Sequence, residues 1–339
     1  MFGSLKRSLF TLSPQEASFE RRDFDCIDSM ARASLEEVLR VFISGYNLTL
    51  EIQDYEFLAQ RFETTFDSHH VGFAYEGAGM CCALLDLLAP RRTSRLRAFT
   101  DTAGRKHDYI ATVGAGFAVA RLPYGLRVLD RYFEKLDPMI GWCVLDGYGF
   151  HQGVFHHRIF IDECKDPPRV LADYGKQLFD SGIGRSLWWV RGASPVLIRQ
   201  SIDRFPEARR GEMWHGVGVA AAYAGGVGEE TLMELPALSG NYRADFLSGI
   251  PFAARMRQRG GNASPTTDMA CTVLLKMTAD QAADLLVRNL DEISAEWAGT
   301  QKELGKKGYM LVRERVTNGF QFEEKEMNPR FSMSLAVSR

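Results

Sequence analysis

Two glycine-rich stretches of the sequence place an acid and an imidazole at corresponding positions. Residues 66–84 (FDSHHVGFAYEGAGMCCAL) align without a gap on residues 205–223 (FPEARRGEMWHGVGVAAAY) at a shift of 139, which sets Glu76 opposite His215. A buried carboxylate beside an imidazole shifts both pKa values and forms an acid–base pair, so we expect these residues to move protons. In the alternative interpretation each side chain bonds only within its own segment, because ionised groups in apolar helices need a partner in any case.

A second set of candidates lies in residues 138–168, a stretch rich in glycine, aromatic residues and histidine. We interpret its centre, DGYGFH, as a loop, because loops of such composition commonly carry function. Asp146 could orient or charge His151 there. The aromatic residues that could wall an apolar substrate are Trp142, Tyr148 and Phe150. A structural turn that packs aromatic side chains between two halves of the molecule is the competing interpretation.

Small and aromatic residues elsewhere could shape the same substrate pocket. Gly79 and Gly218 correspond in the two aligned stretches. Small residues at such positions either let helices approach closely or leave room for a ligand. Trp188 and Trp214 could line a cavity, although filling the core is the default role of aromatic residues.

Metal and cofactor signatures are absent from the sequence. The seven histidines include the adjacent pairs His69-His70 and His156-His157, but no HxH or HxxxH spacing occurs. A GxGxxG placed after a strand, a Walker lysine loop, a GxSxG elbow and a CxxC are also missing. We therefore predict neither a metal nor an organic cofactor, and keep a metal-dependent oxidative enzyme only as a weaker alternative.

The elements that position these residues read as helices in two related halves. Two further blocks match in the same order, residues 42–45 with 179–182 and residues 114–118 with 249–253. We predict a mostly α protein made of two diverged, internally duplicated helical halves, related by a pseudo-two-fold axis and enclosing an apolar cavity. The expected parts are an N-terminal tail (1–25), a first helical repeat (26–137), a glycine-, aromatic- and histidine-rich connection (138–168), a second helical repeat (169–275) and a C-terminal helix and tail (276–339).

Bulk composition narrows the class of protein. The chain has 339 residues and 45% hydrophobic content, enough for a large core, and its 41 basic residues nearly balance 43 acidic ones, which argues against nucleic acid as a partner. Six cysteines without CxxC spacing favour a reduced, cytoplasmic setting. The first residues lack a long apolar core and read as a mobile tail. The apolar runs at 110–122 and 216–227 are too short to span a membrane.

Several phrases together carry a resemblance to a known family. They are SPQEASFERRDF (13–24), GFAYEGAGM (72–80), DGYGFHQGVF (146–155), GIGRSLWWV (182–190) and MWHGVGVAAAYAGG (213–226). They resemble a bacterial family of enediyne biosynthesis proteins of the UnbL type, encoded beside an iterative polyketide synthase and the UnbV and UnbU proteins. The resemblance implies natural-product biosynthesis with a polyene or polyketide-derived substrate, and it supplies no catalytic residues.

These lines lead to one expected function and one main alternative. We expect a cofactor-independent cyclase or isomerase that acts on an apolar, polyunsaturated intermediate, with Glu76, His215, Asp146 and His151 moving protons. The alternative is a binding or chaperone protein that presents a polyene to UnbV- or UnbU-like partners. A homo-oligomer fits either function.

Overall fold

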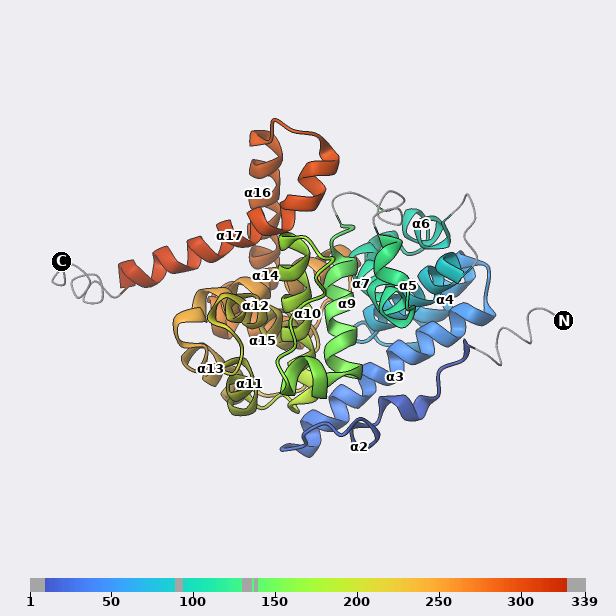
Figure 1. Ribbon diagram of the computed structural model, residues 1–339, viewed down its shortest axis with the longest axis horizontal. Helices are drawn as coiled ribbons and strands as arrows, with labels where there is room; N and C mark the ends of the chain where they lie inside the picture. The colour runs from blue at the N-terminus through green and yellow to red at the C-terminus, as the bar shows by residue number, and fades with distance from the viewer. Residues whose placement is uncertain (1–9, 89–93, 130–135, 137–139, 328–339) are drawn as a thin grey trace.

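The structure, a computed structural model, describes residues 10–88, 94–129, 136 and 140–327. Every regular element in these ranges is helical, as Figure 1 shows, so the prediction of a mostly α protein is confirmed. Side-chain caps start several of the helices. The Asp28 carboxylate accepts the backbone N–H of Met30 at 2.7 Å, and Thr278 and Gln281 form a reciprocal capping box.

Seven long helices form a row in which each packs against the next one along the chain. The helices of this row are α3 (Ser29–Glu51), α5 (Val71–Leu88), α7 (Asp108–Arg121), α9 (Cys143–Phe155), α10 (Asp173–Val190), α12 (Glu207–Tyr223) and α14 (Arg243–Gly260). Beyond α14, α16 (Ala279–Glu296) and α17 (Gln301–Met327) complete the packing. In Figure 1, α9 and α10 lie side by side near the centre of the molecule.

Shorter helices fill the connections of the row. They are α2 (Phe19–Arg22), α4 (Tyr55–Thr65), α6 (Arg95–Asp101), α11 (Pro195–Ile202), α13 (Glu229–Leu238) and α15 (Pro265–Ala270). The row curves back on itself, so that the start of α5 lies against the ends of α12 and α14. The rings of Phe73 and Tyr223 are 5.2 Å apart, and the Arg257 guanidinium donates to the His69 carbonyl oxygen at 2.6 Å.

Glycine sits where each helix of the row crosses its neighbours. A methyl group on Gly79 would overlap the carbonyl oxygen of Ala111, and one on Gly114 would overlap that of Glu76. Backbone therefore touches backbone at these crossings, and no larger residue fits without moving a helix. The glycines that face the preceding helix are Gly77, Gly114, Gly147, Gly182, Gly216 and Gly249, and those that face the following helix are Gly45, Gly79, Gly116, Gly149, Gly184 and Gly218.

The glycine pairs explain why the two aligned stretches look alike. The glycines that face the preceding helix recur at intervals of 33–37 residues. Gly77 of α5 and Gly216 of α12, which the shift of 139 superimposes, are four helices apart in the row. In α7, α9 and α10 too, one glycine faces the preceding helix and a second, two residues later, faces the following helix. The unit that recurs in the packing is therefore a single helix.

Two sequence interpretations need correction. The DGYGFH segment, interpreted as a loop, is part of α9, and its glycines pack against α7 and α10. The N-terminal segment was expected to be mobile, yet residues 10–25 are docked: the Phe19 side chain is buried, and its N–H donates to Glu36 at 2.9 Å. Residues 1–9 of that segment lie outside the described residues.

Helix α5 has the length and composition of a membrane span, with a mean hydropathy of 1.4, yet 83% of it is buried inside the protein. Among the described residues it is the one helix that meets these criteria. It packs against both α3 and α7.

Candidate functional site

Three of the predicted catalytic residues occupy equivalent places in the helix row. At each crossing, the carbonyl oxygen of one residue faces a glycine of the following helix. We call these residues the crossing positions, and they are Phe42, Glu76, Val113, Asp146, Ser181 and His215, continued by Ser248 in α14. The sequence comparison paired only Glu76 with His215, whereas Asp146 belongs to the same series.

Asp146 is fully engaged by the next helix. Its carboxylate accepts a hydrogen bond from the Ser181 hydroxyl at 2.9 Å and forms an ion pair with Arg185, and all three side chains are buried. The guanidinium carbon of Arg185 lies 4.7 Å from the ring centroid of Phe150. Asp146 therefore stabilises a buried cation instead of orienting His151, which lies five residues further along the same helix.

His215 is also bonded to the next helix, through Ser248. Its Nδ1 lies 2.8 Å from the Ser248 hydroxyl, which itself donates to the Asp245 carbonyl oxygen at 2.6 Å. Because that hydroxyl proton is committed, Nδ1 must be the donor, and the lone pair is assigned to Nε2. Burial, with the nearby charges of Arg313 and Arg185, holds the pKa of His215 well below its usual value, so the ring is neutral at pH 7.

Glu76 differs because both of its neighbours in the series are apolar. Phe42 precedes it and Val113 follows it, and Oε1 of Glu76 has no hydrogen-bond partner among the described residues. The side chain is only 2% exposed. Burial raises the pKa of Glu76 to about 7, with Arg185 opposing and Asp146 adding to the shift. The carboxyl group can therefore give up or take up a proton near neutral pH.

Glu76 opens into an apolar cavity of about 40 Å³, which we call the Glu76 cavity. Its walls come from α3, α5, α7, α9, α10 and the N-terminal segment. Aromatic rings line it in succession: the centroids of Phe42 and Phe117 are 5.1 Å apart, those of Phe117 and Phe150 5.3 Å, and those of Phe150 and Trp189 5.1 Å. A proton donor thus faces an apolar space lined by aromatic rings.

His215 lines a different cavity of about 30 Å³, which we call the His215 cavity. Asp146, Ser181, Arg185 and Tyr309 contribute to its wall. No hydrogen bond joins Glu76 to His215 in the described part of the chain. The predicted acid–base pair is thus divided between two cavities that share walls from α7, α9 and α10.

The fourth predicted catalytic residue, His151, is buried beside the Glu76 cavity. Its ring stacks on Phe155 at 4.3 Å, and its Nδ1 has no hydrogen-bond partner among the described residues. Burial and the neighbouring cation of Arg121 hold the pKa of His151 well below its ordinary value. The ring is neutral and packs as an aromatic side chain.

The predicted substrate-binding residues divide between cavity walls and core packing. Phe150 lines the Glu76 cavity, and Trp142 lines the His215 cavity. The indole N–H of Trp188 donates to the Gly225 carbonyl oxygen at 2.8 Å inside the core. Residues that pack between helices are Tyr148 against Phe179, Trp214 against Phe246, Gly79 against Ala111 and Gly218 against Phe246.

The sequence analysis missed a group at the mouth of the Glu76 cavity. Leu12, Glu16 and Arg22 of the N-terminal segment line it, together with Arg121 at the end of α7. The segment is held in place because the Phe19 side chain is buried and the Phe19 N–H donates to Glu36 of α3. The alternation of apolar and charged residues in SPQEASFERRDF was the available signal.

A larger cavity of about 290 Å³ lies between α14, α15 and α16, and its polar groups already serve the fold. Gln258 donates to the Asp280 carboxylate at 3.3 Å, and the Thr267 hydroxyl donates to the Ala222 carbonyl oxygen at 2.8 Å. Thr278 caps α16. The Glu76 cavity is smaller but holds the unengaged acid.

Metal-binding and thiol chemistry find no support in the described residues. No group of three or more His, Cys, Asp or Glu side chains there lies close enough together to hold a metal ion. Cys82 is buried, and burial raises the pKa of its thiol to about 12, so it stays protonated and poorly nucleophilic.

Comparison with known proteins gives a family without an assigned activity. No curated protein and no solved structure matches the chain. The family described as "Protein of unknown function (DUF1702)" matches residues 1–320, a range that contains both cavities. The chain belongs to this family.

Proposed function

We propose that the protein is a cofactor-independent acid–base enzyme, a cyclase or isomerase, that acts on a polyunsaturated substrate in the Glu76 cavity. The observation that carries the proposal is Glu76 itself. Its carboxyl group is buried, has a pKa raised to about 7 and one oxygen without a partner, and it faces an aromatic wall. Such an environment is typical of a general acid and costs stability, so it suggests selection for chemistry.

The proposed step moves one proton and keeps the composition of the substrate. Protonated Glu76 gives its proton to a carbon of the conjugated chain, so that a C–H bond forms and the positive charge spreads over the remaining double bonds. Rotation about a former double bond, or attack by a second double bond, then rearranges the chain. Loss of a proton from another carbon to the Glu76 carboxylate gives an isomer of the substrate and restores the acid.

The walls of the cavity suit the cation that this step creates. Aromatic faces attract cations by about 0.5–2 kcal/mol each, more strongly where water is excluded. Phe117, Phe150 and Trp189 lie in ring-to-ring contact along the wall. An apolar lining also prevents water from capturing the cation.

The other predicted acid–base residues take supporting places in this proposal. Asp146 and Arg185 fix the boundary between the two cavities through their buried ion pair. His215 keeps a neutral ring whose Nε2 could serve as a base in the His215 cavity. Glu76 alone combines a raised pKa with an oxygen that no neighbour occupies.

The natural-product context of the proposal rests on the resemblance to the enediyne biosynthesis family. That resemblance favours a polyene or polyketide-derived substrate, with UnbV- or UnbU-like proteins as partners. We also propose that the chain arose by duplication of one helical half. The repeated glycine pairs support repetition within the chain.

A binding protein that shelters a reactive polyene is the second candidate. The observation that favours it is the almost uniformly apolar lining of the Glu76 cavity, since pockets of this kind bind hydrocarbon chains without reacting with them. In that case Glu76→Gln retains full function. Loss of activity with retained ligand binding distinguishes the enzyme from the carrier.

Solvent labelling tests the enzyme. Purified protein is incubated in D₂O with a panel of linear conjugated polyenes, and mass spectrometry measures deuterium in recovered substrate and new isomers. We expect deuterium with the native chain and none above background with Glu76→Gln. Glu212→Gln is the matched control, because Glu212 is also buried with a pKa raised to about 7. Equal labelling by native protein and Glu76→Gln would overturn the proposal.

A further inference from the structure

Two guanidinium groups gather at the mouth of the Glu76 cavity. The guanidinium carbon of Arg22 lies 4.1 Å from the ring centroid of Phe155, and that of Arg121 lies 5.2 Å from the same centroid. All three residues line the cavity. Arg22 comes from α2 and Arg121 from the last turn of α7, so the pair assembles only in the folded chain.

Positive charge exceeds negative charge at this mouth. The single carboxylate that lines it, Glu16, pairs with both Arg21 and Arg22. For Arg121, no ion pair or hydrogen bond is found among the described residues. Burial lowers the pKa of Arg22, the charge of Glu16 opposes this shift, and the charge of Arg121 adds to it. Glu16 also acts on the pKa of Arg121, so one carboxylate serves both guanidinium groups. An anion placed between the two would relieve this repulsion.

The nearest part of the cavity adds no competing anion. Beyond Phe155 the wall consists of Phe150, Val154 and Phe117, which are apolar, and the next carboxyl group is that of Glu76. His151, whose ring stacks on Phe155, is neutral. The site therefore presents a cationic entrance, an aromatic interior and an acid at depth.

We propose that this site takes an amphiphile with an anionic terminus, a carboxylate or phosphate, at Arg121 and Arg22 and an unsaturated hydrocarbon chain that extends to Glu76. The planar guanidinium fork matches both termini by paired hydrogen bonds. The inference deepens the proposed function and rests on it for the reaction of the chain. The charge requirement for binding stands apart from any turnover.

Entry of a chain requires the N-terminal segment to move. A cavity of about 40 Å³ holds a few water-sized guests at most, far less than a long hydrocarbon chain. Residues 10–16 cover it, held by the two bonds between Leu12 and Asn47, each 2.9 Å long, and by the ion pairs of Glu16 with Arg21 and Arg22. This cover is the part that we expect to swing away.

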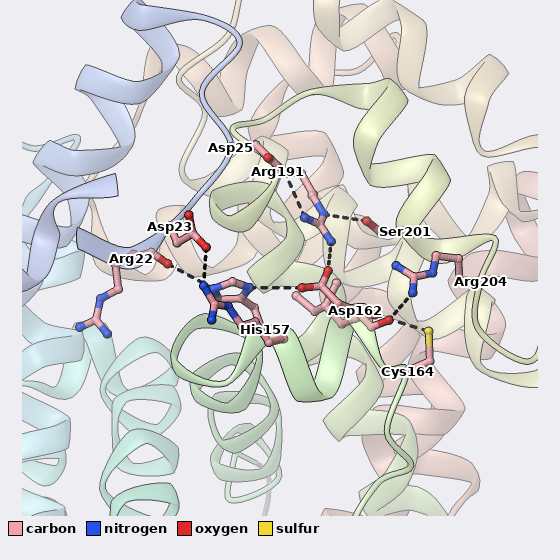
Figure 2. Close-up of polar contacts among 11 residues, drawn as sticks. Arg22, Asp23, Asp25, His157, Asp162, Cys164, Arg191, Ser201 and Arg204 are labelled. Carbon is pink, nitrogen blue, oxygen red and sulfur yellow. Dashed lines mark hydrogen bonds and ion pairs between the residues drawn. The ribbon is translucent and has the colours of Figure 1, made fainter. Parts of the chain in front are cut away.

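The far end of the segment is anchored more firmly, as Figure 2 shows. The His157 ring donates from Nε2 to the Arg22 carbonyl oxygen at 3.2 Å, and Arg191 pairs with both Asp25, at 3.1 Å, and Asp162. The backbone of Arg22 thus stays in place while residues before it move. A head group at Arg22 and Arg121 would be held at the fixed end of the opening.

Fluorescence binding of cis-parinaric acid, a conjugated polyene carboxylate, tests the inference. We expect the acid to bind roughly tenfold more tightly than its methyl ester, the discrimination that a charge-assisted hydrogen bond gives. Arg121→Gln should bring the acid close to the ester. Arg199→Gln is the matched control, because Arg199 is exposed on α11 and pairs with Asp203 away from the cavity.

Competition against bound parinaric acid separates anionic from neutral termini, and the stronger competitor of the two anions shows which terminus the site prefers. Oleic acid and oleyl phosphate should displace it, and oleyl alcohol should displace it at least several-fold less well. Equal binding of acid and ester, an unchanged preference in Arg121→Gln, or no binding of any of these compounds overturns the inference. A thermal melt of each variant shows whether a loss of binding comes from unfolding.

The same assay on Glu76→Gln keeps this inference apart from the proposed reaction. If the variant binds parinaric acid with the native preference and the native protein labels no polyene in D₂O, the anionic site holds and the enzyme proposal fails. If labelling depends on Glu76 but acid and ester bind alike, the reverse is true.

Discussion

Glu76 and Glu212 are the same residue type, similarly buried, and the pKa of each is raised to about 7, yet the two lie in opposite chemical settings. Glu212 accepts a hydrogen bond from Tyr309 at 3.3 Å and pairs with Arg313 at 2.9 Å, which also binds Asp245. Glu76 lines an aromatic cavity whose wall includes Phe42.

The difference teaches that burial alone does not identify a catalytic acid. Glu212 joins α12 to α17 in a network in which each charge has an opposite charge beside it, so its carboxylate has a structural use. In Glu76, by contrast, Oε1 has no hydrogen-bond partner among the described residues. Glu76 also differs from the other titratable residues at the crossing positions. Asp146 is followed in the series by Ser181 and His215 by Ser248, and each serine bonds to it, whereas Glu76 is followed by Val113, which has no hydroxyl.

The largest effect is expected from exchanging the two glutamates for glutamine. Glu76→Gln should lower turnover about 10²–10⁴-fold, the usual contribution of a placed general acid. Glu212→Gln should leave turnover within a few-fold but lower the free energy of unfolding by about 1–3 kcal/mol, because Arg313 keeps Asp245 but loses its second carboxylate partner. Rate assays and denaturant melts on both variants check this. Similar kinetic losses in both would erase the distinction between the two acids.

Packing, unlike chemistry, should respond alike in the two regions. Gly79→Ala beside the Glu76 cavity and Gly218→Ala beside the His215 cavity each put a methyl group into a neighbouring backbone. We expect each to lower the free energy of unfolding by about 3 kcal/mol or more. Gly228→Ala is the control, since its added methyl group meets nothing within 4 Å. Chemical denaturation measures all three, and a harmless Gly218→Ala would contradict the shared packing role.

Both glutamates should make stability fall as pH rises. An acid with an ordinary pKa near 4.5 when unfolded and about 7 when folded binds more protons in the folded state between those values, so the free energy of unfolding decreases from pH 4.5 to 7. The decrease amounts to about 3 kcal/mol for each group. Glu76→Gln and Glu212→Gln should each remove their own share of the slope. A native protein whose stability rises over this range would contradict both shifts.

The smallest effect is the most specific test of the crossing positions. Val113→Ser places a hydroxyl at the crossing position that follows Glu76, as Ser181 follows Asp146. A hydrogen bond to the charged form favours that form, so the pKa of Glu76 should fall by about one unit. Infrared titration of the carboxyl band in native protein and variant follows the change. Val119→Ser, elsewhere on α7, serves as the control and should leave the pKa of Glu76 in place.

Much of the architecture could be predicted from residue patterns. The helical character of the chain and the burial of its Gly/Ala-rich segments, such as residues 71–88, followed from the amino-acid types. The prediction of two halves came from one long alignment and two short blocks that match in the same order. The packing shows why that alignment was incomplete: a glycine pair serves every crossing, so similarity recurs at each helix.

The rest of the site could not be predicted, because it depends on contacts between distant residues. Nothing in the order of Glu76 and His215 shows that they face different cavities, since which side of a helix opens depends on its neighbours. The loop interpretation of DGYGFH failed because glycine and aromatic residues are common to loops and to tightly crossed helices. Arg121 and Arg22, about a hundred residues apart, meet only when the N-terminal segment docks.

The docked N-terminal segment also sets an order of events during translation. The N–H of Asp25 bonds to the Val190 carbonyl oxygen at 3.0 Å, and Arg191 pairs with the Asp25 carboxylate. Asp25 is translated well before Val190 and Arg191, so it reaches these contacts only after those residues have been made. A nascent polypeptide that ends before Val190 leaves the apolar surface beneath the N-terminal segment uncovered. At that stage the chain is most exposed to aggregation and to chaperones.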